Sequence, residues 1–221
     1  MKLSTRVVRV ALLSGVLLSL LEACSTGRSL PSAVVNDSAT QAASTQPDLY
    51  PGRKPRVDQR AQQRFQMGVT AMAVQDWDTA EQDMQWLVQH YPRLSGPYLN
   101  LALIYKQQRS MNDAERYYQA ALEVNSSNLE AYNHYALFLR EAGRFPEAET
   151  VYLEALGVWP DHAETHRNLG VLYDLYYGNV ERALVHYYRY QTLTGGESRQ
   201  VASWIVDLER RSGQIVSRQL P

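Results

Sequence analysis

Residues 129–162 read LEAYNHYALFLREAGRFPEAETVYLEALGVWPDH. Small and large apolar side chains recur at helical spacing in both halves of this stretch, which predicts two amphipathic helices in succession. Pro160 closes the unit, because proline cannot continue a helix. The side chains expected to face inward are Tyr132, Tyr135, Ala136 and Leu139 on the first helix and Ala148, Tyr152 and Ala155 on the second.

The same pattern returns about every 34 residues. Four copies are expected, at residues 61–94, 95–128, 129–162 and 163–197. In the fourth copy, the inward-facing residues of the second helix come one position late, after Gly178 and Asn179; these residues are Ala183, Tyr187 and Tyr190. This delay predicts that the turn between the two helices of the fourth copy holds one extra residue.

Two helices that cross closely need small residues where their backbones approach. The small residues expected at these crossings are Gly68, Ala102, Ala136 and Gly170 on the first helices and Ala80, Ala114, Ala148 and Ala183 on the second. One repeat cannot bury its apolar faces alone, so at least about three must stack and the last face needs a cover. Residues 198–212 fit this cover as a capping helix, and residues 213–221 are expected to form a disordered tail. The apolar side of the capping helix carries Val201, Trp204, Ile205 and Leu208.

The joint recurrence of the glycine or alanine, tyrosine and proline positions resembles the tetratricopeptide repeat family. The resemblance implies an all-α fold in which residues 59–197 form an α-solenoid of four helix-turn-helix repeats, followed by the capping helix. It also implies a protein that binds other proteins and is not an enzyme. The alternative is an unrelated helical bundle in which the alanines recur by chance.

The N-terminus has a different composition. Lys2, Arg6 and Arg9 precede an apolar run, residues 10–21. This run is too short for a membrane-spanning helix, which needs about 20 residues, but it has the length of the apolar core of a secretory signal peptide. Residues 1–23 are therefore expected to be a signal peptide.

The apolar run ends in Leu21-Glu22-Ala23-Cys24-Ser25, which resembles the lipobox of bacterial lipoproteins, although Glu22 replaces the small or apolar residue that the family prefers. The resemblance implies cleavage before Cys24, lipidation of Cys24 and a stable membrane anchor. Ser25 implies the periplasmic side of the outer membrane. The alternative is ordinary cleavage nearby, with Cys24, the chain's only cysteine, left as a free thiol.

Residues 24–58 follow as a segment rich in Ser, Ala, Thr, Gln and Pro. Such a composition cannot bury enough apolar surface to fold, so a disordered linker is expected. The whole chain has a formal net charge of −1 and no run of Lys and Arg that would form a basic face. Nucleic acid is therefore not expected as a partner, and no sequence motif indicates a cofactor.

Partner-binding residues are expected on the concave surface of the solenoid, which the first helix of each repeat lines. The candidates for a peptide-binding groove are Phe65, Met72, Leu99, Asn100, Lys106, Asn133, Arg140, Arg167 and Asn168. Phe65 and Met72 are expected to be exposed. Arg140 and Arg167 are favoured over Lys106, because a guanidinium forms fixed bidentate bonds to carboxylates.

An apolar row runs beside these candidates and leaves two interpretations open. Either it contacts a bound segment, or it only packs neighbouring first helices together. The row consists of Val69, Leu103, Leu137 and Val171. Tetratricopeptide domains that clamp a C-terminal carboxylate carry basic and Asn residues in the first repeat, where this chain has Phe65 and Val69, so that clamp is not expected.

Three other patterns contain residue types that occur in functional sites. His162 and His166 are four positions apart and could share a metal ion, but His166 occupies a core position of the repeat, so a metal site is not favoured. Tyr117 and Tyr188 lie one position off the buried tyrosine row and form either an exposed patch or part of the core. Glu149 is expected on a solvated helix face, and no catalytic residues are predicted.

The combination of a lipobox and tetratricopeptide repeats resembles the pilotins of type IV pili. These are outer-membrane lipoproteins that assist assembly of the secretin channel, and they generally carry more repeats than four. The resemblance implies a scaffold that binds a protein or peptide segment of an envelope complex. An accessory of a TonB and ExbB type energy-transducing complex is the alternative, and a metal-binding protein or enzyme is a remote one. The sequence gives no prediction of the oligomeric state.

Overall fold

The computed structural model describes residues 57–219, and the side chains of residues 57–213. The predicted signal peptide, Cys24 and nearly all of the predicted linker lie outside the described residues. Throughout the described range the regular structure is helical. The helices are α1 Gln59–Ala73, α2 Trp77–His90, α3 Ser95–Gln107, α4 Met111–Val124, α5 Leu129–Glu141, α6 Phe145–Val158, α7 Ala163–Val171, η1 Leu172–Tyr176, α8 Val180–Leu193 and α9 Arg199–Gln219.

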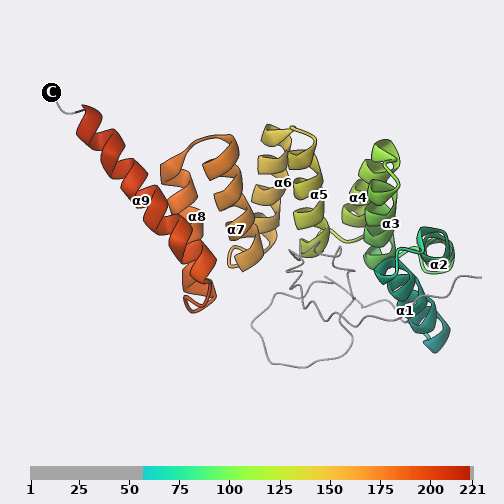
Figure 1. Ribbon diagram of the computed structural model, residues 1–221. Helices are drawn as coiled ribbons and strands as arrows, with labels where there is room; N and C mark the ends of the chain where they lie inside the picture. The colour runs from blue at the N-terminus through green and yellow to red at the C-terminus, as the bar shows by residue number, and fades with distance from the viewer. Residues whose placement is uncertain (1–56, 220–221) are drawn as a thin grey trace, which may run out of the picture. The chain divides into compact units, whose positions relative to one another are not determined.

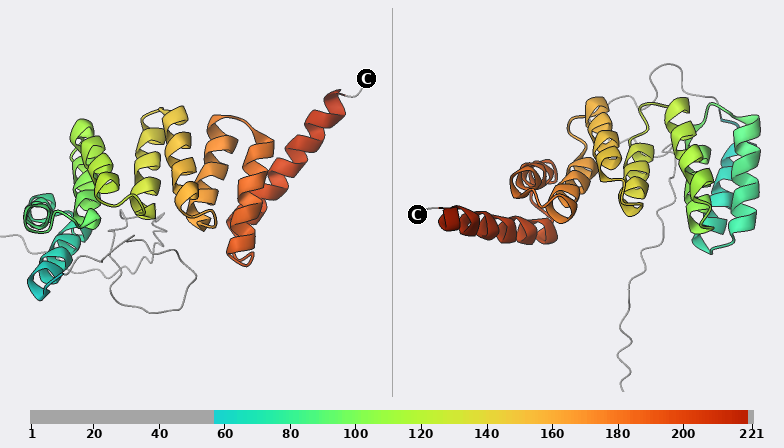
Figure 2. Two further views of the ribbon diagram at one scale, coloured as in Figure 1. Left: turned by 180° about the vertical axis from the view of Figure 1, so that it is seen from behind. Right: turned by 90° about the horizontal axis from the view of Figure 1, so that it is seen from above.

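The helices form four antiparallel pairs, α1 with α2, α3 with α4, α5 with α6, and α7 and η1 with α8. Each pair packs against the next in chain order, and α9 packs on α8 at the end of the row (Figures 1 and 2). The predicted all-α solenoid of helix-turn-helix repeats is therefore confirmed. No helix within residues 57–219 is long and apolar enough to cross a membrane.

The turns inside the repeats share one geometry. In the first three repeats a backbone N–H bonds the carbonyl oxygen five residues earlier, for example Ser110 to Tyr105 at 2.9 Å and Arg144 to Leu139 at 2.9 Å. The residue before each such N–H has a positive φ, as in Arg109 (63°) and Gly143 (76°). This bonding satisfies carbonyls that the end of the first helix leaves free, so it fixes where the second helix begins.

The fourth repeat departs from this geometry. The equivalent bond joins Asn179 N–H to the Tyr173 carbonyl at 2.8 Å, which spans six residues. The additional residue is absorbed by η1, a π-helical stretch in which Tyr177 N–H bonds the Leu172 carbonyl at 3.2 Å. The prediction that the extra residue lies in the turn was wrong, because the first helix widens by one residue before the turn at Gly178 begins.

Close crossing of the paired helices depends on the predicted small residues. A Cβ built on Gly170 would lie 2.4 Å from the ring of Tyr187, and one built on Gly68 would lie 2.7 Å from Cε of Met84. The large side chains of the second helix thus pack directly on the backbone of the first. Tyr187 is buried, as are Tyr118 and Tyr152 at the equivalent positions of earlier repeats.

The capping helix α9 covers the last repeat with Val201, Ile205 and Leu208, which are buried, and with Trp204, which packs 5.4 Å from the ring of Tyr187. It is longer than predicted, because the helical backbone continues to Gln219. The prediction of a disordered tail beginning at residue 213 was therefore wrong for the described part of that tail.

We predict that Gly170→Ala lowers the free energy of unfolding, by up to about 2 kcal/mol. The added methyl group meets the buried ring of Tyr187, and overpacking costs about 1–3 kcal/mol, against a gain of about 1 kcal/mol in helix propensity. Gly157→Ala is the matched control, since Gly157 is exposed in α6 with nothing within 4 Å of an added Cβ, and it should be stabilising by up to about 1 kcal/mol. Denaturant unfolding of both variants measures the difference, and equal stabilities would contradict the proposed close crossing.

Candidate functional site

A hydrogen bond from a tyrosine to a glutamate crosses every boundary between consecutive repeats. The glutamate lies on the second helix of one repeat, and the tyrosine lies on the first helix of the next. The hydroxyl to carboxylate distances are 2.7 Å for Tyr105 to Glu81, 3.0 Å for Tyr135 to Glu115 and 2.5 Å for Tyr173 to Glu149. Glu149 is therefore not part of a purely solvated helix face, and that prediction was wrong.

The second boundary also carries an ion pair. Arg144, at the start of α6, donates to both carboxylate oxygens of Glu115, at 2.8 and 2.7 Å. It also donates to Glu147 in the first turn of α6. These bonds from Arg144 hold the pKa of Glu115 below its ordinary value, so the carboxylate stays charged and available to Tyr135.

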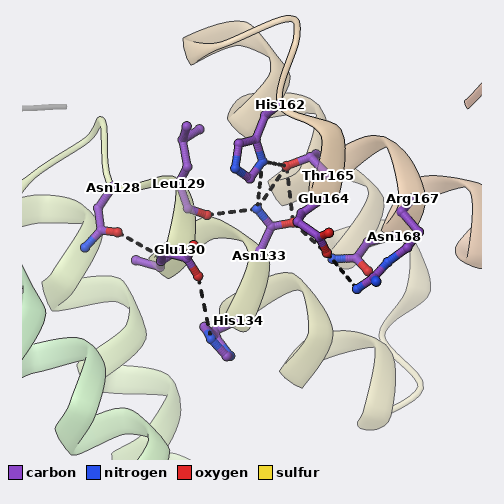
Figure 3. Close-up of polar contacts among 11 residues, drawn as sticks. Asn128, Leu129, Glu130, Asn133, His134, His162, Glu164, Thr165, Arg167 and Asn168 are labelled. Atoms are coloured by element: carbon purple, nitrogen blue, oxygen red, sulfur yellow. Dashed lines mark hydrogen bonds and ion pairs between the residues drawn. The ribbon is translucent and has the colours of Figure 1, made fainter. Parts of the chain in front are cut away.

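Polar residues from α5 and α7 meet at the third boundary (Figure 3). Asn133 is buried and donates to the Leu129 carbonyl and to Oγ1 of Thr165, both at 2.9 Å. Its Oδ1 accepts a bond from Nδ2 of Asn168 at 3.1 Å. The structure thus brings together two predicted groove residues, Asn133 and Asn168. Their bonds link neighbouring first helices, and Asn133 has little capacity left for a ligand.

Three other predicted groove residues are inaccessible. Met72 is 1% exposed, and Leu99 and Asn100 are fully buried. The prediction that Met72 is exposed was wrong, because the end of the first helix packs into the core that α1 and α2 share with α3. In the apolar row, Leu103 is buried and Val171 packs on the core, which favours packing of the helices over contact with a ligand.

The remaining groove candidates are partly exposed, and the charged ones differ in whether they already form an ion pair. They are Phe65, Lys106, Arg140, Arg167 and Asn168. Lys106 forms an ion pair with Glu141 at 2.6 Å, and Arg167 forms one with Glu164 at 2.6 Å. Arg140 forms neither an ion pair nor a hydrogen bond with any residue from 57 to 213, and its guanidinium carbon lies 5.5 Å from the ring centroid of Tyr176.

An aromatic surface of exposed large side chains lies beside Arg140, at a place that repeat periodicity did not predict. Leu175 is 69% exposed, Tyr176 43% and Tyr177 39%. They occupy the end of η1 and the residue after it, and Tyr176 also packs against Phe145 with ring centroids 4.8 Å apart. The signal that could have found this surface is the run of large side chains next to the inserted residue, since contiguous exposed apolar side chains often mark an interaction site.

The two tyrosines considered for an exposed patch behave differently. Tyr117 is half-buried and stacks on Tyr105 with ring centroids 5.3 Å apart, so it belongs to the edge of the core. Tyr188 is exposed and donates its hydroxyl to Glu209 of α9. They lie on α4 and α8, in different repeats, so of the two alternatives the core one holds for Tyr117 and the exposed one for Tyr188.

The histidines make a contact that sequence spacing did not predict. His166 bonds the Pro160 carbonyl through Nε2 at 2.8 Å, and its Nδ1 lies 3.0 Å from Nδ1 of His186 on α8. Nδ1 of His162 lies instead 2.8 Å from Oγ1 of Thr165. Among the described residues no group of three or more His, Cys, Asp or Glu side chains is arranged to hold a metal ion.

A family model described as Tetratricopeptide repeat matches residues 99–163 and again residues 139–197. This chain contains tetratricopeptide repeats. The family model and the described helices agree on the stacked helix pairs, and tetratricopeptide repeats typically serve as non-enzymatic scaffolds for protein interactions. The fold therefore supports a protein-binding scaffold.

Solved structures with the same fold include PilF of Pseudomonas aeruginosa, with a TM-score of 0.62 and 22% identity over 71% of this chain and 70% of that one. A tetratricopeptide repeat protein of Parabacteroides merdae has a TM-score of 0.60 and 20% identity over 71% and 62% of the two chains. One from Thermus thermophilus has a TM-score of 0.54 and 21% identity over 72% and 82%. No curated protein sequence matches the chain.

We predict that the fourth repeat loses stability as the pH falls from about 6.5 toward 4. Burial lowers the pKa of His186 and of His162 from 6.5 to about 4 and also lowers that of His166. Below pH 6.5 the unfolded chain therefore binds more protons than the folded chain, and the free energy of unfolding decreases. Denaturant unfolding at a series of pH values measures this slope.

The variant His186→Phe should weaken that pH dependence, because it removes one titrating group and keeps an aromatic ring against Tyr173. Val185→Ala is the control, since Val185 is exposed on the same helix and has no titratable group, so the substitution should leave the slope unchanged. If the free energy of unfolding depends on pH equally in wild type and His186→Phe, the claim that burial of His186 causes this dependence is contradicted.

Proposed function

We propose that this protein is a lipid-anchored scaffold on the periplasmic side of the outer membrane that binds a segment of an envelope complex and assists its assembly. The observation that carries the proposal is a tetratricopeptide array downstream of a lipobox-like stretch ending in Cys24 and Ser25. A lipid anchor followed by a polar linker lets the repeats search for partners near the membrane while remaining attached.

The likeness to PilF favours a pilotin-like role, in type IV pilus or secretin assembly, over other envelope systems. The sequence resemblance to pilotins points in the same direction. The partner would meet the first-helix surface, where Phe65, Arg140 and Arg167 remain partly exposed.

Photo-crosslinking in cells tests the scaffold. A crosslinking residue at Phe65, Arg167 or Leu175 samples the first-helix surface and the aromatic surface, and one at Val185 of α8, which is also exposed, serves as the matched control. We expect a specific envelope subunit to be trapped from the first three positions and not from Val185. Trapping of a secretin subunit would support the pilotin-like role, whereas a TonB or ExbB type partner would contradict it. Equal trapping from all positions, or none, would contradict the scaffold.

The anchor has its own test. We predict that Cys24→Ser abolishes incorporation of labelled palmitate and releases the protein from the membrane fraction, because the sulfur that would carry the lipid is lost. Ser25→Ala is the matched control and should retain the label. Unchanged labelling in Cys24→Ser would show that the chain is not anchored through this residue.

A further inference from the structure

Of the three predicted groove residues that carry a positive charge, two are neutralised by an ion pair. Lys106 is neutralised by Glu141, and Arg167 by Glu164. Arg140 of α5 has no carboxylate partner among residues 57–213. Asp174 of η1 pairs with Arg211 of α9 at 2.6 Å and not with Arg140. The surface therefore carries a positive charge that the described part of the chain leaves uncompensated.

The surroundings of Arg140 limit how its guanidinium can be used. The guanidinium carbon lies 5.5 Å from the centroid of the Tyr176 ring. A cation in this position is attracted to the face of the aromatic ring. Its Nε is buried and has no hydrogen-bond partner within the described residues, which is unusual because buried donors are nearly always satisfied. A planar, partly exposed guanidinium with unused donors is suited to a carboxylate.

The π-helical insertion supplies the apolar part of the same site. It is confined, within residues 57–219, to the first helix of the fourth repeat, and it ends at Tyr176. Tyr176 packs on Phe145, so the cation and the two rings form one cluster from α5, α6 and η1. Leu175 is exposed next to this cluster, where the third repeat has Glu141 and Ala142 near the end of its first helix.

We propose that Arg140, Tyr176 and Phe145 form the binding site for an acidic segment of a partner protein. An Asp or Glu side chain of that segment binds the guanidinium of Arg140, and an adjacent apolar side chain packs on Tyr176 and Leu175. The inference deepens the proposed scaffold function and rests on it. The choice of a peptide over a lipid follows from the aromatic and aliphatic side chains beside the cation, because they add a specific apolar contact that a headgroup does not use.

Selection of peptides tests the site directly. The purified full chain, in detergent, is used to select binders from a random peptide library displayed on phage, and the tightest peptides are measured by fluorescence polarisation. We expect the binders to share an Asp or Glu next to an apolar residue. Arg140→Gln should weaken their binding by about tenfold or more, as loss of a charge-assisted bidentate contact does. Arg140→Lys should also weaken it, because the ammonium group lacks the planar fork.

Arg116→Gln is the matched control. It removes an arginine of α4, a second helix outside the first-helix surface, and Arg116 is already paired with Asp113, so binding should remain within about twofold. Peptides in which the shared acid is replaced by Asn or Gln should bind weakly to wild type and lose no further affinity with Arg140→Gln, which assigns the carboxylate to this guanidinium. Coincident thermal unfolding curves verify that the variants fold.

Binders without a shared acidic residue, or with equal affinity for wild type and Arg140→Gln, would overturn the site. Binding of phosphatidylglycerol vesicles that depends on Arg140, without peptide binding, would overturn it in favour of a lipid headgroup. These outcomes differ from failure of the proposed function. If peptides bind through Arg140 but crosslinking in cells traps no envelope subunit, the site stands and the envelope role fails. If crosslinking traps an envelope subunit but peptide binding does not depend on Arg140, the envelope role stands and the site fails.

Discussion

Stacking of consecutive repeats is the constraint on which the whole structure depends, because no helix pair can bury its apolar faces alone. Each boundary adds a tyrosine hydroxyl that reaches back to a glutamate of the preceding repeat, as Tyr135 does to Glu115. Within each repeat, Gly170 and its equivalents let a large side chain of the second helix lie on the backbone of the first. Close crossing and polar links between repeats therefore fix the order and spacing of the helices together.

These links also decide which side chains are left for a partner. Asn133 and Asn168 are joined across α5 and α7, and Lys106 is held by Glu141, so residues that look available on the first helices are partly committed to the fold. Unlike Lys106, Arg140 has no ion-pair partner within residues 57–213. The extra residue in η1 places Tyr176 beside it, which turns an irregularity of the fourth repeat into a distinct surface.

Much of this fold could be predicted because periodicity reports which side chains face inward, and Tyr118, Tyr152 and Tyr187 are buried as expected. Periodicity could also show that one residue is inserted between Gly170 and Ala183, but it could not place that residue in the helix or in the turn. The site was harder to predict, since the exposure of Met72 depends on how closely neighbouring repeats approach. Whether Arg140 or Arg167 finds a carboxylate likewise depends on rotamers and on contacts between helices.

A double-mutant cycle at the second boundary tests the central claim that polar links across boundaries hold consecutive repeats together. The free energy of opening of α4 and α5 would be measured by amide hydrogen exchange in wild type, Tyr135→Phe, Glu115→Gln and the double variant. Exchange is suitable because a repeat array can open one unit at a time. The structure predicts a coupling energy of about 0.5–1.5 kcal/mol between the two side chains. A coupling energy of zero, with the single effects simply adding, would contradict it.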